Sequence, residues 1–452
     1  MLRLSWTQPE DLVPHALRAA ELDGRDVADL RDEWVAAGGS VDAPVSGATP
    51  QPADAAVREL GRRILAAIDT RPDPAALVAS EPNDVDGILA LAEPRAELGD
   101  APEDLANRVL GAWLGRASGC LLGKPVEKIP RRGIRAIAES TGNWPIASYF
   151  TEIGLDPAVA AEFPWNRRSR PTSLVENISG MPEDDDLNFP LIALDLIERI
   201  GTEFTTEDVA QSWLANLPGG RVFTAERIVY RNLLDGYEPE VAGEVMNPFR
   251  DWIGAQIRTD VYGWVSPGQP QRAARMAWHD ARLSHGRSGL YGALFAAAAC
   301  SASLVTDSVA EVIEAGLSVV PSGSRYAEAI RWGATLGASE TSLDESLDRI
   351  EQRYGHLHWV HALNNSALLA FALARGNGDF ERTITSAVSG GWDTDSVGAT
   401  AGSIVGGMLG AAALPSAWID PLQNRLASSV PGFDGIGFTT LAERTVAVAV
   451  RP

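Results

Sequence analysis

Two clusters of carboxylate side chains stand far apart in this sequence. The first is Glu-Asp-Asp-Asp at residues 183–186, and the second is Trp-Asp-Thr-Asp-Ser at residues 392–396, behind Gly390 and Gly391. Carboxylates this close together repel one another unless a cation neutralises them, and all-oxygen ligand sets suit hard cations such as Mg²⁺ or Mn²⁺. If the fold brings the clusters together, the sequence predicts a two-metal site, which catalyses displacement at an electrophilic centre.

Each cluster directly precedes a run of apolar residues at helical spacing, so each is expected at the N-terminus of a helix. Helix capping is the alternative interpretation, because Asp and Ser are good N-caps and a single Asp before a helix is usually a cap. Three consecutive Asp residues exceed what one cap can use. The repeated pattern therefore favours metal binding for the pair of clusters.

The elements that must position these clusters are predicted to be helices throughout. Leu187, Leu191, Leu194 and Ile197 repeat at helical spacing behind the first cluster, and few alternating runs occur anywhere. The fold class is therefore expected to be all-α. Residues 1–104 contain helical segments separated by stretches rich in Pro, Gly and Asp, and they are interpreted as a helical N-terminal extension to a compact multi-helix domain over residues 105–452.

The segment from Val397 to Leu414 is largely apolar, with glycines at spacing four from Gly398 to Gly410. This spacing resembles a transmembrane packing face. The segment is mostly Gly and Ala, however, and the acidic cluster at its start would be costly in lipid. We therefore expect a helix buried in a protein core and packed closely through its glycines.

Composition limits the possible partners. The chain has 452 residues, 45% of them hydrophobic, and a formal net charge of −22, so it can form a sizeable core but repels nucleic acid and anionic membranes. Neither is an expected partner. Cys120 and Cys300 lie in small apolar surroundings and are predicted to be buried thiols rather than a disulfide. Because the N-terminus has no signal-peptide pattern, a cytoplasmic location is expected.

Three motifs in order resemble those of the ADP-ribosylglycohydrolase family, which includes the dinitrogenase reductase-activating glycohydrolase and the ADP-ribosyl-acceptor hydrolases. Residues 111–127, GAWLGRASGCLLGKPVE, look like the family's N-terminal motif. Residues 183–186 resemble its Thr-Asp-Asp-Thr motif, and residues 390–396 resemble its Gly-Gly-Asp-Thr-Asp-Thr motif. The resemblance spans roughly residues 105–412 and leaves the extension outside.

The resemblance implies an all-α domain with two Mg²⁺ or Mn²⁺ ions in a central cleft. By this resemblance Asp395 would bridge the two ions, and Glu127, Asp185 and Asp395 would be catalytic. The implied metal ligands are Glu183, Asp184, Asp185, Asp393, Asp395 and Ser396. For Glu127, a salt bridge with Lys124 or Lys128 is the alternative interpretation.

The resemblance also suggests residues that contact substrate. Residues 254–258, ending in Arg258, look like the family's Gly-rich substrate loop, and Ser284-His285 looks like its Thr-His segment. Gly123 and Trp392, from the first and last motifs, complete the expected substrate-binding set. A purely structural histidine is the alternative for His285. The histidines between 356 and 361 lack the spacing of a zinc site and are expected to be wall or core residues.

Three departures from the family pattern bear on the substrate. Glu183 replaces a hydroxyl ligand, Asp186 replaces a threonine, and Cys120 stands where many relatives have Asp. The first two make the site more anionic. Because few Arg or Lys residues flank the motifs in sequence to pair with phosphates, a smaller, uncharged N-glycoside or nucleoside is expected as substrate instead of a diphosphate such as ADP-ribose.

The leading hypothesis is therefore a metal-dependent glycosyl hydrolase that cleaves a ribosyl C1–N or C1–O bond. Its substrate would be an ADP-ribosylated protein, another ADP-ribosyl conjugate or a small riboside. A two-metal phosphohydrolase, a structural crystallin-like family member and a non-catalytic ADP-ribose-binding module are the alternatives. The N-terminal extension could cover the cleft and restrict access to small substrates.

Overall fold

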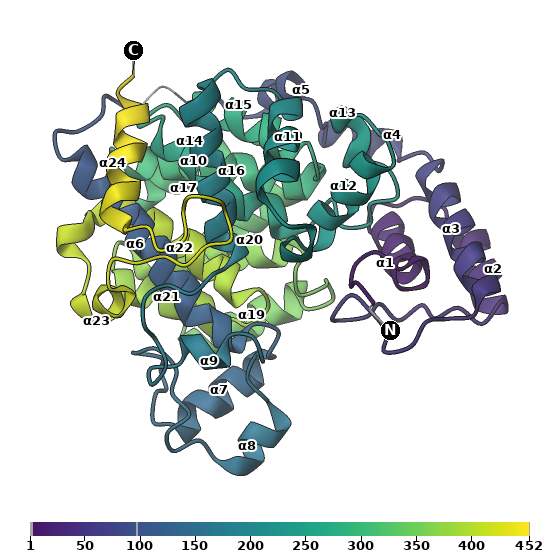
Figure 1. The fold of residues 1–452 in the computed structure, drawn as a ribbon, viewed down its shortest axis with the longest axis horizontal. Helices are drawn as coiled ribbons and strands as arrows, with labels where there is room; N and C mark the ends of the chain where they lie inside the picture. The colour runs from purple at the N-terminus through teal and green to yellow at the C-terminus, as the bar shows by residue number, and fades with distance from the viewer. Residues whose placement is uncertain (1–2, 96–97, 452) are drawn as a thin grey trace.

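The computed structural model describes residues 3–95 and 98–451, and these residues fold almost entirely into helices (Figure 1). Within this part of the chain, β pairing is limited to three isolated bridges, Met181–Leu426, Trp252–His361 and Leu426–Ile436. The prediction of an all-α fold is confirmed.

The helices follow one another along the chain, joined by connections of varied length. The extension contains α1 (Pro9–Leu22), α2 (Ala28–Ala36), α3 (Ala55–Asp69), α4 (Ala75–Ser80) and α5 (Val85–Leu91). The first half of the body contains α6 (Leu105–Gly123), η1 (Lys124–Val126), α7 (Arg131–Ser140), α8 (Pro157–Glu162), α9 (Arg170–Ser173), α10 (Asp185–Ile200), α11 (Thr206–Asn216), η2 (Gly219–Arg221), α12 (Thr224–Leu234), α13 (Pro239–Ala242), η3 (Ile253–Arg258) and α14 (Asp260–Trp264). The second half contains α15 (Pro270–Ala281), α16 (Arg287–Ser303), α17 (Val309–Leu317), α18 (Arg325–Gly337), α19 (Leu343–Tyr354), α20 (Ala362–Gly376), α21 (Phe380–Ser389), α22 (Thr394–Leu409), η4 (Ala411–Ala413), α23 (Ser416–Ile419), η5 (Asp420–Leu422) and α24 (Phe438–Ala449).

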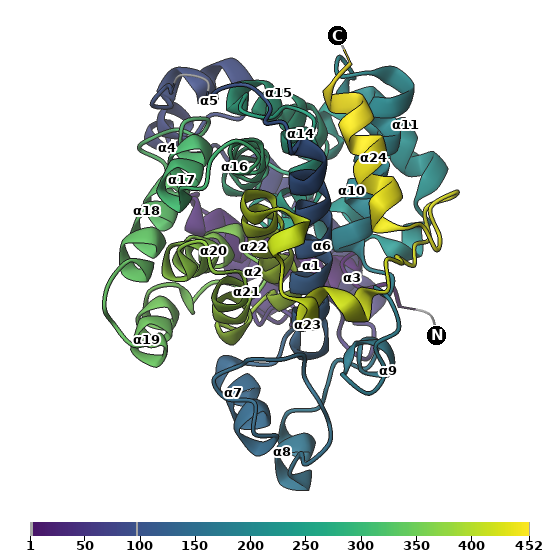
Figure 2. The ribbon, with the colours of Figure 1, turned by 90° about the vertical axis from the view of Figure 1, so that its left-hand side faces the viewer.

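Helices α6 and α22 form the central pair of the body and lie side by side in Figure 2. Their glycines face one another in antiparallel order, and a Cβ atom on any of them would collide with the opposite backbone; the facing pairs are Gly111 with Gly406, Gly115 with Gly402, and Gly119 with Gly398. The predicted core helix is confirmed at residues 394–409. Because the backbones touch, the C-terminal end of α6 lies against the N-terminal end of α22.

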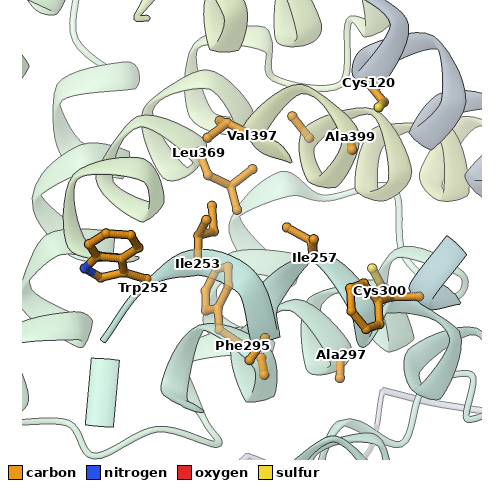
Figure 3. Packing of buried hydrophobic residues seen from close by; sticks show 14 of the residues in the cluster. Cys120, Trp252, Ile253, Ile257, Phe295, Ala297, Cys300, Leu369, Val397 and Ala399 are labelled. Atoms are coloured by element: carbon orange, nitrogen blue, oxygen red, sulfur yellow. The ribbon is translucent and has the colours of Figure 1, made fainter. Parts of the chain in front are cut away.

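Further helices surround this pair. α21 and α20 lie beside α22, α24 packs on α6, and α16 lies beyond η3. The apolar side chains of Ile253 and Ile257 on η3 lie between the helix that carries Val397 and the helix that carries Phe295 (Figure 3). η3 is therefore held from both sides and forms a rigid support next to the acidic clusters.

The N-terminal extension packs onto the body, and its buried residues join the same hydrophobic core. Trp6 is buried, with its ring 5.4 Å from that of Phe249 and 5.5 Å from that of Trp252. The buried Asp23 accepts hydrogen bonds from Arg287 at 2.8 Å and Arg250 at 3.0 Å. Apolar contact and ion pairs therefore both hold the extension. Whether residues 1–104 form a separate domain stays a prediction.

Two further expectations can be compared with the structure. Cys120 and Cys300 are both free and buried, as predicted. Across residues 3–95 and 98–451, the structure contains no helix with the length and apolar character that crossing a membrane requires.

Candidate active site

The first acidic cluster begins α10, as its sequence pattern predicts. Asp184 is the N-cap, and its Oδ1 accepts a hydrogen bond of 2.9 Å from the backbone N–H of Asp186. The strand-like pairing of Met181 with Leu426 holds the segment that leads into the helix, through a 2.8 Å bond from the Met181 N–H to the carbonyl of Arg425. The capping interpretation is thus correct for Asp184. Glu183 and Asp185 lie on either side of it and remain candidates for metal binding.

The second cluster begins α22. Gly391 and Trp392 both have positive φ, 81° and 65°, and this turn places Asp393 at the N-cap position and Asp395 in the first turn. A bulky residue such as Trp in this region of φ is strained. Because α22 touches α6 through the glycines, Asp395 lies next to the end of α6. The two clusters meet, since the Ser396 hydroxyl donates a 3.3 Å hydrogen bond to Oδ2 of Asp186.

Glu127, just beyond η1, joins the second cluster. Carboxylate oxygens of Glu127, Asp393 and Asp395 all lie within 4.8 Å of one another. The orientation of the Glu127 carboxylate is set by two donors, Asn166 Nδ2 at 2.6 Å and Lys128 Nζ at 3.0 Å. The salt bridge considered as an alternative for Glu127 therefore exists, but it occurs inside the acidic site rather than on a remote surface.

Burial and mutual repulsion raise the pKa values of several carboxyl groups in the site. Burial, together with Asp395 and Glu127, raises the pKa of Asp393 well above its ordinary value. Burial and the charges of Glu127 and Asp184 raise the pKa of Asp395 to about 7. Burial and two neighbouring Asp residues also raise the pKa of Asp185. Closely spaced buried carboxylates with raised pKa values are the expected state of a cation site without its cation, so the residues fit a hard divalent ion.

A cleft of about 1130 Å³ opens over both clusters. Its lining includes Glu127, both acidic clusters, and Ile253, Gly254 and Ile257 of η3. Arg167, Arg168 and Arg221 also line it, and all three are exposed. Ser5, Trp6 and Ser46 of the N-terminal extension contribute another part of the lining. The cleft is large enough for a nucleotide-sized ligand.

A family model identifies the family of this chain. The model of the ADP-ribosylglycohydrolase family matches residues 101–450. The chain belongs to the ADP-ribosylglycohydrolase family. Membership supports a glycosyl hydrolase activity at the level of the family. An uncharacterized protein from Archaeoglobus fulgidus is 25% identical over 328 residues, which cover 72% of this chain and 92% of that protein. A solved structure of an ADP-ribosylglycohydrolase-related protein complex has a TM-score of 0.45 and 20% identity, and the match covers 77% of this chain and 98% of the solved one.

The structure brings the metal-ligating residues expected of an ADP-ribosylglycohydrolase to one cleft. Glu183, Asp184, Asp185, Asp393, Asp395 and Ser396 all line it, together with Glu127. Their roles as ligands or catalytic groups stay predictions. Four other predicted site residues, Gly123, Arg258, His285 and Trp392, are not among the lining residues.

Arg258 is fully buried beneath the cleft. It forms ion pairs with Asp280 and, at 2.7 Å, with Glu226, and its Nη2 donates to Ser284 Oγ at 2.8 Å. The direct contact of Arg258 with substrate stays a prediction; in this structure its guanidinium is occupied by core partners. Glu226 does line the cleft, so Arg258 acts on the cleft through Glu226.

The other three residues also have structural surroundings. His285 is buried, with Nδ1 2.7 Å from Ser284 Oγ, and its expected substrate contact stays a prediction. Gly123 packs against the backbone of Thr394 and Asp395, which lets α6 and α22 meet. Trp392 packs against the hydrophobic core, and its carbonyl accepts from the Lys128 N–H at 3.4 Å. Gly123, His285 and Trp392 thus support the site from positions outside the cleft lining.

Several residues of the site escaped sequence reasoning. Arg116 is fully buried in α6; it donates from Nε to the Asp186 carbonyl at 2.7 Å and from Nη1 to Asp260 at 2.6 Å. Asn365 accepts from the Asp393 N–H at 3.3 Å. Neither has a sequence signal of its own. A charged residue in the apolar face of a helix, as Arg116 is, could have indicated a buried partner.

Proposed function

We propose that this protein is a metal-dependent glycosyl hydrolase that cleaves a ribosyl C1–N or C1–O bond. The observation that carries the proposal is the group formed by Glu127, Asp393 and Asp395 in a deep cleft of a family chain. Buried oxygen donors at this spacing suit Mg²⁺ or Mn²⁺. A bound divalent ion supplies a Lewis acid that orients the ribose hydroxyls and polarises water.

Side chains of the protein bind the ion and transfer the proton. Asp393, Asp395 and the Ser396 hydroxyl would hold the ion at the start of α22. Glu127, held by Asn166 and Lys128, accepts the proton of the attacking water. The water oxygen forms the new bond to C1, the C1–N or C1–O bond breaks, and the leaving group takes up the proton that Glu127 accepted from the water. The surrounding carboxylates favour positive charge on the sugar during bond cleavage.

The rim of the cleft favours a substrate that carries phosphate. The sequence shows few basic residues beside the motifs, but the tertiary structure brings Arg167, Arg168 and Arg221 to the cleft. Guanidinium groups bind phosphate in a bidentate manner. We therefore propose ADP-ribosyl conjugates as better substrates than plain ribosides. The Arg221 guanidinium is 3.0 Å from Glu183, which leaves Arg167 and Arg168 as the main phosphate contacts.

Product analysis tests the proposal. The purified chain is incubated with Mg²⁺ or Mn²⁺ and a panel of ADP-ribosylated arginine and serine peptides, O-acetyl-ADP-ribose, and plain nucleosides. We expect release of ADP-ribose, with Asp393→Asn lowering the rate at least about 1,000-fold while helical content is unchanged, because the variant removes a charged ligand. Asp86→Asn, at an exposed position of α5, is the matched control.

The outcomes separate the alternatives. Release of inorganic phosphate instead of sugar would identify a phosphohydrolase. Tight binding of ADP-ribose without any product would support a binding module. Full activity of Asp393→Asn, or activity that survives complete removal of divalent ions, would contradict the metal-dependent mechanism.

A further inference from the structure

We infer that Lys124 occupies the place of one of the two divalent ions, so that this chain binds a single ion at Asp393 and Asp395, beside Glu127. The inference rests on the proposed metal dependence and concerns the number of ions. It begins from the position of the Lys124 ammonium group. Lys124 is buried, forms an ion pair with Asp184, and donates to the carbonyl of Glu183 at 3.2 Å.

The backbone fixes the point from which the Lys124 side chain starts. Lys124 is the first residue after α6, where Gly123 packs against the backbone of α22, and Pro125 follows it within η1. The ammonium therefore enters the first acidic cluster from a fixed point. A primary ammonium is a compact charge with three donors, so it can satisfy several oxygens where a divalent ion would otherwise lie.

Two other members of the first cluster also have cationic partners. Glu183 pairs with Arg221 at 3.0 Å, and Asp186 pairs with Arg116 at 3.4 Å. Among the described residues, Asp185 alone of this cluster forms no ion pair. The first cluster is thus largely neutralised by side chains, which removes most of the attraction for a second ion.

The thiol of Cys120 also disfavours a second divalent ion. Cys120 lies within 4.8 Å of Asp184 and Asp186, at a position where the family resemblance expects Asp. Its Sγ is 3.9 Å from Oδ2 of Asp186. A neutral thiol is a poor ligand for a hard cation. The chain therefore has one fewer carboxylate and one added ammonium at the same end of the cleft.

The second cluster lacks such internal neutralisation. Glu127 pairs with Lys128, while Asp393 and Asp395 form no ion pair among the residues that the structure describes. Lys124 and Lys128 are the only lysines in the whole sequence. In a chain that otherwise uses Arg at every basic position, both lysines lie in the acidic site, where the smaller ammonium group fits between carboxylates.

The test is the number of Mn²⁺ ions bound per chain, measured by equilibrium dialysis with metal analysis at saturating Mn²⁺. We expect one ion for the wild type, two for Lys124→Met and one for the matched control Lys128→Met. Electron paramagnetic resonance adds a second readout: the wild type should show the six-line spectrum of an isolated Mn²⁺, and Lys124→Met the broadened spectrum of a coupled pair.

Two ions in the wild type, or one ion in both the wild type and Lys124→Met, would overturn the inference and leave the proposed function intact. No bound ion in the wild type would overturn both. If Lys124→Met fails to fold, the wild type labelled with ¹⁵N-lysine replaces it. The spectrum then contains the signals of only two lysines. The ammonium signal of Lys124, protected from exchange with water, should persist at saturating Mg²⁺. Its loss would overturn the inference.

Discussion

Asn166 donates a 2.6 Å hydrogen bond from its amide to Oε2 of Glu127 and thereby fixes the carboxylate that we assign as proton acceptor. Replacing Asn166 with Ala should lower kcat about 10- to 100-fold, since a misplaced base loses a hydrogen bond worth about 1–3 kcal/mol. KM and Mn²⁺ affinity should change little. The measurement is steady-state kinetics alongside metal titration.

The exposed Asn177, which donates to the Arg170 carbonyl, gives the matched control Asn177→Ala. A kcat equal to that of the wild type in Asn166→Ala would show that Glu127 needs no such positioning. A loss of metal binding in that variant would instead assign Asn166 a structural role.

Gly115 of α6 lies directly against the carbonyl of Gly402 in α22, and this contact sets the distance between the helices that carry the two motifs. In an isolated helix Gly→Ala stabilises by about 1 kcal/mol. Here Gly115→Ala should destabilise by about 2–3 kcal/mol, because the added methyl group forces the backbones apart. Urea unfolding measures the effect. Gly323→Ala, with open space around its Cβ position, is the control and should be close to neutral.

Arg167 and Arg168 line the cleft and are exposed, so their guanidinium groups are available to phosphate. The double variant Arg167→Gln and Arg168→Gln should raise KM for an ADP-ribosyl peptide at least about 10-fold, since charge-assisted hydrogen bonds contribute about 1.5–3 kcal/mol each. KM for an uncharged riboside should not change. Arg349→Gln, on the exposed face of α19, is the control. An equal effect on both substrates would contradict phosphate binding.

Histidines from the extension and the body gather at their contact. His15 lies with its ring 5.2 Å from that of His358, and burial lowers the pKa of His15 to about 4, of His358 to about 2 and of His361 to about 3. The unfolded chain binds protons that the folded chain does not, so this contribution to stability is fully present above about pH 6.5 and falls as the pH decreases toward each folded-state pKa. For His15 the loss should reach about 2 kcal/mol at pH 5.

The measurement is Tm between pH 7.5 and 5 for the wild type and His15→Gln, which cannot titrate in this range. The variant should show a shallower fall in Tm. His356→Gln, at an exposed position, is the control and should follow the wild type. Parallel curves for the wild type and His15→Gln would contradict the prediction.

Trp6 lines the cleft and packs against Phe249 and Trp252, so it links the extension to the active site. Trp6→Ala should weaken this contact by about 3–5 kcal/mol, since it removes a buried indole. We expect faster proteolysis within residues 37–54 and a higher turnover of bulky ADP-ribosylated proteins relative to small conjugates. Leu4→Ala, at a 44% exposed residue, is the control. Unchanged substrate preference would mean that the extension does not restrict access.

The sequence by itself determined the helical class, the family motifs and the helix starts at Asp184 and Asp393. These features depend on local spacing, capping and apolar periodicity, which short segments carry on their own. The sequence also predicted that a core helix packs closely through glycines at spacing four, whereas the structure identified α6 as its partner.

Only the tertiary structure decided which charged groups meet. Arg258 and His285 stand in segments that resemble substrate loops, yet the fold buries both outside the cleft lining, where each contacts Ser284 Oγ. Arg167 and Arg168 are distant from every motif in sequence, yet they reach the cleft. Lys124 lies within the first motif, and its ion pair with Asp184 spans 60 residues. Electrostatic partners depend on distance in space, which sequence separation does not report.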